Sequence, residues 1–563
     1  MDNDKHDETS YFCERLGIFS TCGVCFMERQ LLTYKSTGEF SNLVLDYLDK
    51  NDSLRSFYCR PPQLGQVPEQ IREKSANFST ESRTRLVNAL KRQYSEVILS
   101  EAVSERVEAQ IKSLSSPKTF TVTTGHQLNL FTGPLYFIYK IFGAINLAEQ
   151  YAEKNKDYRF IPVFWMASED HDFEEISHFR TADQKILWDR QAKGPVGRLL
   201  CTEMDAVIQQ LEGLWGNTVI GQKMLDLFRQ VYTPDVTLAV ATRRLVHEIF
   251  KDYNLLVIDG DDPLLKSGFV SIIRAELIEG KCSQAIENTT QALVAAGYHK
   301  QVHPRAINLF YCDNGLRERI IATETGFAVD QTDLFFTKDE ILGLLAERPE
   351  LFSPNALLRP LYQESVLPNL AYIGGGAEVA YWLQLKACFD HCDLTYPMVY
   401  LRNSVALVPA KVQKKLKSLN FDLCDLFLTT EELSSLYITR NSALEIDFTE
   451  QKDHLIKQFA QLYDLAKKTD ASFLGAVGAQ EKKQLKGLAR LEQRLLRAEK
   501  RKHAADIERL IALRQWIFPD GVLQERKENM SWAYQYLGAD FLSHLKTHID
   551  PSDQRFTLLI FNS

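Results

Sequence analysis

The chain has 563 residues, of which 45% are hydrophobic and 25% are charged, a composition typical of folded globular proteins. Its formal net charge is −8, from 66 basic and 74 acidic side chains, which argues against nucleic-acid binding because that requires a broad positive surface. The length exceeds the roughly 100–200 residues of one domain, so we expect a large core with at least one added domain.

Two features of the sequence predict the compartment. The start of the chain is acidic and does not resemble a signal or transit peptide. No run of about 18 apolar residues, the length that spans a bilayer, occurs anywhere in the sequence. We therefore expect a cytoplasmic protein without a membrane partner.

The ten cysteines have no regular spacing. Cys22 and Cys25 form a single CxxC motif, and no second pair follows at zinc-finger spacing. Ordinary reduced thiols are the favoured interpretation, with zinc or redox chemistry at this pair as the alternative. Cys388 and Cys392 could share a helix face near His391, where core packing is favoured, so no metal ligand is predicted.

Along the chain, residues 1 to about 115 predict a mainly helical segment. Residues 119–124 are β-branched and aromatic and predict a strand, Gly125 to Gln127 a turn, and residues 135 to about 154 a helix. Further strands are predicted where short apolar runs occur, at residues 160–166, 255–259, 371–373 and 397–401.

Buried strands that alternate with helices predict an α/β fold with a doubly wound parallel sheet. Residues 116–448 would form this core, with insertions or crossovers at about 190–250 and 280–370. In such sheets ligands bind at the carboxyl ends of the strands.

The C-terminal third has a different pattern. Leu455, Phe459 and Leu462 begin an apolar repeat at three- and four-residue spacing that returns later in the segment. Residues 449–518 therefore predict a coiled-coil hairpin of two long antiparallel helices, with a plain helical bundle as the alternative. Its basic face is either solvated or binds a partner, and residues 519–563 are expected to return to the core.

The strongest candidate for ligand binding is the segment Thr123 to Gln127, between a predicted strand and a predicted helix. Gly125 lets backbone amides approach a phosphate closely, and a helix start offers free N–H groups and a positive dipole end. His126 could hydrogen-bond a phosphate or move a proton near neutral pH. A purely structural turn is the alternative.

A second candidate is the acidic cluster Glu169, Asp170, His171 and Asp172 at the end of an apolar strand. Ionisable groups beside a hydrophobic run are costly unless they have partners, and such clusters are often functional. They could orient polar substrate groups, act as a general base or hold Mg²⁺. The alternative is a helix N-cap followed by a solvated acidic turn.

Three further positions follow predicted strands. Asp259 could bind ribose or sugar hydroxyls, or belong to an acidic turn that caps a helix beginning at Pro263. Glu378 follows three glycines and could bind an ammonium or hydroxyl group, with a flexible strand-to-helix joint as the alternative. Arg402, followed by Asn403, could hold a carboxylate through its guanidinium group.

Taken together, these segments resemble the cysteine-adding enzymes of bacillithiol synthesis. The resemblance runs from about residue 118 to 405 and extends to the late helical hairpin and to residues 555–559. It is carried by the stretches TTGHQLNLFTGPLYFIYKI, PVFWMASEDHDFEEI, LLVIDGDDP, YIGGGAEVAYW and PMVYLRNS. It implies a Rossmann-like core with connecting-peptide insertions and a coiled coil that promotes homodimers.

The family resemblance also implies the reaction, the last step of bacillithiol synthesis, in which the carboxyl of cysteine forms an amide with the amine of glucosamine–malate. The implied core is similar to nucleotidyltransferases and class I aminoacyl-tRNA synthetases, whose (H/T)xGH motif contacts ATP phosphates. Thr123 to His126 match this motif, so ATP or ADP, with Mg²⁺, is the implied cofactor. A KMSKS-like loop is absent, since neither Lys266-Ser267 nor Lys411 to Lys415 fits, and the way the carboxyl is activated stays open.

On this hypothesis the TTGHQ segment holds phosphates, and Asp170, His171 or Asp172 deprotonates the sugar ammonium. The remaining substrate contacts are assigned to Asn129, Glu169, Asp259, Glu378, Tyr381 and Arg402. A nucleotidyltransferase acting on another small acid and a non-catalytic nucleotide-binding scaffold are the alternatives. The acidic cluster disfavours the scaffold, which would carry its desolvation cost without benefit.

Overall fold

The computed structural model describes residues 27–181, 184–313, 315–444, 446–469, 471–538 and 540–562, so Cys22 and Cys25 lie outside the described residues. The chain divides into two compact units. The first runs to Leu407 and resumes at Gln524–Phe561, and the second is Val408–Leu523. Within the described ranges, no helix is both long and apolar enough to cross a membrane.

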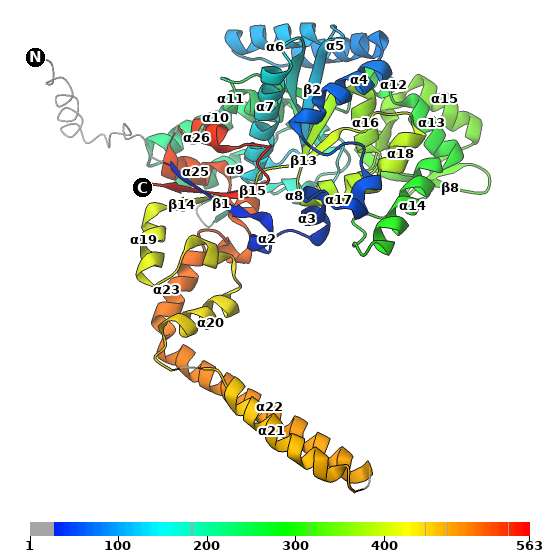
Figure 1. The fold of residues 1–563 in the computed structure, drawn as a ribbon. Helices are drawn as coiled ribbons and strands as arrows, with labels where there is room; N and C mark the ends of the chain where they lie inside the picture. The colour runs from blue at the N-terminus through cyan, green and yellow to red at the C-terminus, as the bar shows by residue number, and fades with distance from the viewer. Residues whose placement is uncertain are drawn as a thin grey trace, which may run out of the picture. The chain divides into compact units, whose positions relative to one another are not determined.

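The centre of the first unit is a five-stranded parallel sheet in the order β13-β12-β2-β3-β6 (Figure 1). Its strands are β2 Thr119–His126, β3 Arg159–Met166, β6 Leu256–Asp259, β12 Asn369–Gly374 and β13 Met398–Leu401. Numbered along the chain, this is the 3-2-1-4-5 order of a doubly wound sheet, in which the direction of winding reverses between β2 and β12. The predicted Rossmann-like α/β fold is confirmed.

Both faces of this sheet are covered, which explains the continuous apolar runs in its strands. Side chains of neighbouring strand residues point to opposite faces. In β3, the ring of Phe164 packs 5.1 Å from that of Phe137 on helix α7 (Tyr136–Lys154). The next residue, Trp165, packs 5.3 Å from the ring of Tyr362 on α16 (Arg359–Val366).

The other helices of the first unit surround the sheet and fill the segments between its strands. They are α2 Tyr34–Thr37, α3 Asn42–Leu48, α4 Val67–Asn77, α5 Thr80–Ser95, α6 Glu101–Ser113, α8 Phe173–Ile176, α9 Asp205–Trp215, α10 Val219–Val231, α11 Leu238–Ile249, α12 Pro263–Ser267, α13 Val270–Glu279, α14 Lys281–Ala295, α15 Lys338–Glu347, α17 Gly376–Gln384, α18 Lys386–His391, α24 Gln524–Lys527, α25 Met530–Leu537 and α26 Phe541–His548. Helices α5 and α6 lie side by side (Figure 1).

Several strands were not predicted. The segment up to residue 115, expected to be mainly helical, contains β1 (Met27–Thr33), which pairs antiparallel with β15 (Arg555–Phe561). β15 also neighbours β14 (Val405–Pro409). The segment 280–370 holds a second sheet, and residues 178–187 form a hairpin. These strands are β7 Leu309–Asp313, β8 Leu316–Ala322, β9 Phe327–Val329, β10 Phe335–Phe336, β11 Phe352–Pro354, β4 His178–Thr181 and β5 Gln184–Leu187.

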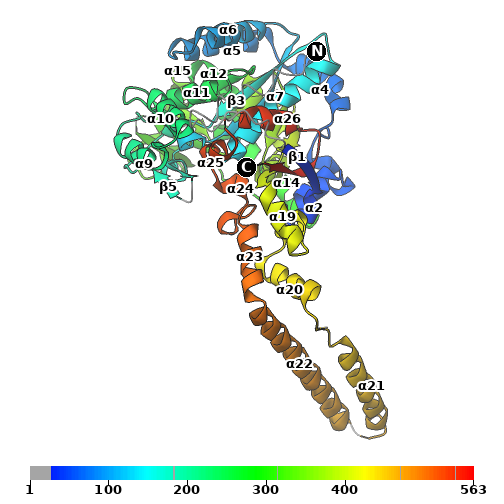
Figure 2. The ribbon, with the colours of Figure 1, turned by 90° about the vertical axis from the view of Figure 1, so that its left-hand side faces the viewer.

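The second unit is helical, and its two longest helices form a hairpin (Figure 2). Its helices are α19 Ala410–Ser418, α20 Thr430–Asn441, α21 Thr449–Ala466, α22 Ala471–Lys502 and α23 Ala504–Arg514. Phe459, Ala466 and Val477 are buried between α21 and α22. Lys452 pairs with Glu492 at 2.7 Å, which fits antiparallel helices. The predicted coiled-coil hairpin is confirmed.

The connection from β2 to α7 differs from the predicted turn. Gly125 and His126 belong to β2, and α7 begins ten residues later, at Tyr136. Between them, Phe131 and Thr132 have φ values of 47° and 70°, a left-handed conformation that is costly for residues with side chains. α7 confirms the helix expected from about residue 135, and although a loop separates it from β2 in the sequence, its first residue, Tyr136, lies with its ring 5.2 Å from that of His126.

Asn529, before α25, holds this strained connection. Its Nδ2 donates to the carbonyl oxygens of Phe131 at 2.7 Å and Gly133 at 2.6 Å. Its Oδ1 accepts from the backbone N–H of Ser531 at 2.9 Å and so caps α25. One buried amide thus joins the C-terminal segment to the loop that follows β2.

We expect Asn529→Ala to lower the free energy of unfolding by about 2–4 kcal/mol, because two buried carbonyls and a helix cap lose their partner. Chemical denaturation followed by circular dichroism measures this value. Asn288→Ala, on an exposed position of α14, is the control and should change it by less than about 0.5 kcal/mol. Equal stability of the two variants would contradict the assigned role.

Candidate functional site

A cavity of about 490 Å³ lies where β2 and β12 end. The winding of the sheet reverses between these strands, and this is the place where doubly wound folds bind ligands. Gly125 and His126, at the end of β2, line the cavity together with Gly375 and Glu378, which follow β12. The other lining residues are Gln127, Tyr136, Lys140, Trp165, Ala167, Glu175, Arg359, Gly376, Ala377, Arg402 and Arg526.

The cavity wall carries more positive than negative charge. Four cationic side chains line it, against the carboxylates of Glu175 and Glu378. Two of the cations have anionic partners, since Lys140 pairs with Glu378 at 2.5 Å and Arg402 with Glu525 at 2.8 Å. The balance favours an anionic ligand.

Arg359 is bound to neutral groups. Its guanidinium donates to Gln363 Oε1 at 3.0 Å and to the hydroxyls of Tyr381 at 3.2 Å and Tyr372 at 3.5 Å. No carboxylate in the described part of the chain forms an ion pair with it. The charge of Arg359 is therefore available to a carboxylate or phosphate.

Glu378 is held as a carboxylate at the start of α17. Burial alone would raise its pKa, but Lys140, the backbone N–H of Gly375 and the hydroxyl of Tyr372 together hold it below its usual value. The Tyr372 hydroxyl donates to Glu378 at 2.5 Å. Gly374 is required here, because a Cβ atom at this position would lie 2.9 Å from the Cβ of Glu378.

His126 is buried at the cavity wall and is neutral. Burial, with Lys140 nearby, lowers its pKa to about 3. Its Nδ1 lies 3.0 Å from the carbonyl oxygen of Gln127, which can only accept, so Nδ1 carries the hydrogen and Nε2 has a free lone pair. With this pKa the ring is uncharged near neutral pH, and Nε2 can accept a hydrogen bond or a proton.

The acidic cluster lies beside the cavity and not in its wall. Asp170 accepts from Gln127 Nε2 at 2.8 Å, and Gln127 also donates to Glu175 at 2.9 Å. Although burial raises the pKa of Asp170, bonds from Gln127 and backbone amides, with Arg317 nearby, hold it below its usual value. Asp170 thus positions Gln127. His126 ends β2 and Asp170 follows the end of the parallel neighbour β3, so both lie at the carboxyl edge of the sheet.

The other predicted acidic and histidine residues have structural partners. Asp172 caps α8, as it accepts from the backbone N–H of Glu175 at 3.1 Å, and this corresponds to the helix-cap alternative. His171 Nδ1 contacts Arg317 at 2.7 Å. Glu169 forms a short ion pair with the buried Lys266.

Asp259 faces a different cavity, which it shares with Asp261 and Arg243. It accepts a short hydrogen bond from Ser168, and burial beside Asp261 raises its pKa to about 6. Asp262, which follows Asp261, caps α12. The predicted sugar contact at Asp259 is therefore separated from the strand-end cavity.

Three more predicted residues are not among those that line the cavity. The Thr123 hydroxyl donates to Asn369 Oδ1 at 2.8 Å, so it binds the neighbouring strand β12. Asn129 Nδ2 donates to the carbonyl of Glu175 at 3.4 Å. Tyr381 contacts Arg359, so its effect on a ligand would pass through that side chain.

Sequence reasoning did not find Lys140, Arg359 or Arg526. A lone lysine on the apolar face of α7 was a usable signal, since burying a lysine is costly unless it has a partner. Arg359 and Arg526 come from segments that only the folded chain brings to β2, and no local pattern marks them.

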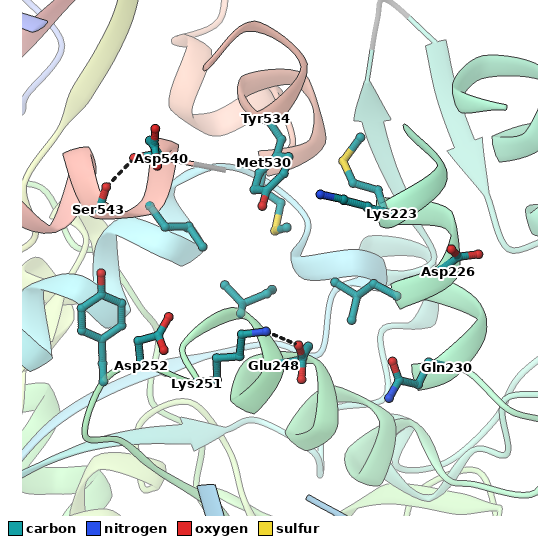
Figure 3. Close-up of a pocket in the computed structure, with 15 residues that line it drawn as sticks. Lys223, Asp226, Gln230, Glu248, Lys251, Asp252, Met530, Tyr534, Asp540 and Ser543 are labelled. Carbon is teal, nitrogen blue, oxygen red and sulfur yellow. Dashed lines mark hydrogen bonds and ion pairs between the residues drawn. The ribbon is translucent and has the colours of Figure 1, made fainter. Parts of the chain in front are cut away.

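A larger cavity, of about 630 Å³, lies between α10, α11, α25 and α26 (Figure 3). Its charged side chains are partly paired with each other, as Lys251 with Glu248 at 2.8 Å. None of the residues predicted to bind substrate lines it, and it lies away from the carboxyl ends of β2 and β12. The strand-end cavity is the better candidate for chemistry.

Comparison with known proteins gives two family matches and close relatives. The model described as "Bacillithiol biosynthesis BshC, N-terminal Rossmann-like domain" matches residues 27–403, and the corresponding C-terminal coiled-coil domain matches residues 405–561. Relatives from Flavobacterium johnsoniae and Christiangramia forsetii, both named "Putative cysteine ligase BshC", are each 43% identical over 95% of this chain. The alignments cover 100% and 99% of those relatives.

We expect His126 to make folding stability depend on pH. Its folded pKa of about 3 is below that of an unfolded histidine, so the unfolded chain binds the extra proton and stability falls as pH drops from about 6.5 towards 3. In His126→Gln the loss of unfolding free energy between pH 7 and pH 5 should be smaller by about 2 kcal/mol.

Urea denaturation at several pH values measures this slope. His299→Gln, which replaces an exposed histidine, is the matched control and should keep the slope of the parent protein. An unchanged slope in His126→Gln would mean that the folded protein protonates His126 as readily as the unfolded chain does.

Proposed function

Because this chain belongs to the BshC family of bacillithiol biosynthesis, we propose that it is a cysteine ligase that forms an amide between the carboxyl of cysteine and the amine of glucosamine–malate. One observation supports the location of this reaction. At the point where the sheet reverses its winding, a single cavity combines unneutralised positive charge with the carboxylate of Glu378.

The chemistry of the substrates matches this combination. Glucosamine–malate carries carboxylates on one part and an amine on the other, and cysteine carries both groups. A volume of about 490 Å³ lies within the range of about 300–1,000 Å³ that small-molecule sites occupy. We assign the malate carboxylates to Arg359, because Arg402 is already paired with Glu525, and the ammonium group of a substrate to Glu378 or Glu175.

Amide formation from a free carboxylate needs activation, because a carboxylate is a poor electrophile. The excess positive charge of the cavity and the free N–H groups at the start of α17 fit a polyphosphate as well as a carboxylate. ATP, with Mg²⁺, would supply the activation when bound. Arg526 and the backbone of Gly376 are the groups of this chain that would hold its phosphates.

We assign the transfer of the amine proton to His126 and not to the acidic cluster. His126 lines the cavity and its Nε2 has a free lone pair, whereas Asp170 is bonded to Gln127 and Asp172 caps a helix. A weak base suffices, because the nitrogen becomes strongly acidic as it bonds to the acyl carbon. Bound anions would also raise the pKa of His126.

A reconstitution tests the reaction. The purified chain is incubated with cysteine, glucosamine–malate and ATP, each omitted in turn, and products are identified by mass spectrometry. The proposal requires bacillithiol only when both organic substrates are present, with AMP or ADP formed in step if ATP is the activator. Nucleotide turnover with other small acids in place of cysteine would support a nucleotidyltransferase instead.

We expect Arg359→Gln to raise the KM for glucosamine–malate about 10- to 100-fold, the effect of losing one charge-assisted contact of about 1.5–3 kcal/mol. His126→Ala should abolish product formation while the far-ultraviolet circular dichroism stays unchanged. Steady-state kinetics with mass-spectrometric detection measure both.

Arg72→Gln is the matched control, since Arg72 lies on the exposed face of α4 and should leave the kinetics unchanged. Near-normal turnover of His126→Ala would remove His126 from the mechanism. A KM for Arg359→Gln that equals the value of the control would remove the substrate assignment of Arg359.

A second part of the proposal concerns assembly, with the α21–α22 hairpin as the contact between two copies of the chain. Large apolar side chains on both helices are exposed to solvent, which is costly unless a partner covers them. They include Ile456, Leu462, Leu465, Leu474 and Leu491. A second hairpin of the same kind would bury them as in other coiled coils.

We expect the double variant Leu462→Glu, Leu491→Glu to convert a dimer into a monomer, because charges would enter the apolar contact. Light scattering after size exclusion should then give the mass of one chain, 64.5 kDa, in place of two. Ile98→Glu, at an exposed apolar position of the first unit, is the control and should stay dimeric. A monomeric parent protein would refute this role of the hairpin.

A further inference from the structure

Three cysteines from two helices meet in the first unit. Cys282 lies in α14, Cys388 lies in α18, and Cys392 follows the end of α18. Their sulfur atoms all lie within 4.8 Å of one another, and those of Cys282 and Cys392 are 3.6 Å apart. Cys282 and Cys388 are almost fully buried, with 1% and 0% of their surfaces exposed.

The spacing of these thiols matches a metal site and not a disulfide. Tetrahedral Zn²⁺ with Zn–S bonds of about 2.3 Å places two sulfur ligands about 3.8 Å apart. A disulfide bond is much shorter, at about 2.05 Å. The separation of 3.6 Å between Cys282 and Cys392 is close to the first value.

A fourth group next to the cysteines has an unsatisfied atom. Glu276, in α13, is fully buried, and its Oε1 accepts from the backbone and side-chain N–H groups of Asn308 at 2.9 and 2.8 Å. Its Oε2 is buried and meets no hydrogen-bonding geometry with any described residue. The carboxyl group nevertheless lies within hydrogen-bonding reach of the Cys282 thiol and interacts electrostatically with Cys392.

We propose that Cys282, Cys388, Cys392 and Glu276 form a structural Zn²⁺ site, with Oε2 of Glu276 as the fourth ligand. A buried carboxylate oxygen without a partner is costly, and coordination would satisfy it. The two donors from Asn308 fix the carboxylate in the way that outer groups orient metal ligands. Three thiolates and one carboxylate carry the same charge as the four thiolates of common structural zinc sites.

The local sequence favours core packing at Cys388 and Cys392. Cys388 is buried in the core, and Cys392 is partly buried at its edge. What the spacing of these two residues could not show is the third thiol, which comes from a helix 106 residues earlier in the chain. The site would tie α13, which precedes the 280–370 insertion, and α14, which begins it, to the helix pair α17–α18. Since α17 begins at the candidate active-site cavity, the metal would brace that helix from its far side.

The test is the zinc content of the full-length chain, purified under reducing conditions without chelators from cells supplied with zinc. Mass spectrometry of the metal should find about one zinc per chain in the parent protein and less than about 0.1 in Cys388→Ser. Cys312→Ser is the matched control, because its thiol is equally buried but outside the cluster, and it should keep the zinc.

Cobalt loading of the parent protein tests the site without any variant, so its result does not depend on whether a variant folds. Co²⁺ added to the zinc-depleted parent protein should produce the strong visible and near-ultraviolet absorption of tetrahedral thiolate coordination. Absence of zinc together with three alkylatable thiols, a disulfide between Cys282 and Cys392, or equal zinc content in Cys388→Ser would each overturn the site.

The fourth ligand has its own comparison. Glu276→Gln should weaken zinc affinity about 10- to 100-fold in competition with a chelator, a scale typical of changes around a metal site. His391→Ala, which removes a side chain beside Cys392, should keep the affinity of the parent protein. The opposite pattern would overturn the assignment of Glu276. Both measurements use metal binding, so their outcome is independent of the proposed ligase reaction.

Discussion

The candidate site depends on the reversal of winding between β2 and β12. Parallel strands present their carboxyl ends at one edge of a sheet, and where successive crossovers leave in opposite directions no helix closes the gap. Gly125 and His126 therefore face Gly375 and Glu378 across a cavity that the strand order itself creates. A strained loop joins β2 to α7, and the first residue of α7, Tyr136, lines the same cavity.

Charge placement around the cavity separates structural from available cations. Arg402 is buried against Glu525, which lies 123 residues later, so the C-terminal segment is needed to neutralise it. Arg359 is instead held by tyrosine and glutamine groups, which fix its direction without cancelling its charge. Such an arrangement is oriented before the ligand arrives and needs little reorganisation when it binds. His126 stays neutral in this positive environment.

The thiol cluster and the strand-end cavity are built from different residues, but two consecutive helices, α17 and α18, connect them. α17 begins at the cavity with Glu378 in its first turn, and α18, with Cys388, follows it directly. A metal held between α14 and the end of α18 would therefore limit the movement of α17 without taking part in the reaction. The proposed metal site would thus be separate from the chemistry at the start of this helix.

Local patterns in the sequence determined the elements. β-Branched and aromatic residues indicated β2, a continuous apolar run indicated β3, and the repeat around Phe459 indicated the hairpin. Burial on two faces leaves a continuous apolar run, and burial on one face leaves a periodic one. The same information placed His126 and Glu378 at strand ends. Tertiary structure alone decided the pairing of β1 with β15, the arrival of Arg359 at the cavity and the meeting of three distant cysteines, because such contacts depend on sheet topology and leave no local period. It also decided which acidic groups would be helix caps, since a cap and a catalytic carboxylate look alike until their partners are known.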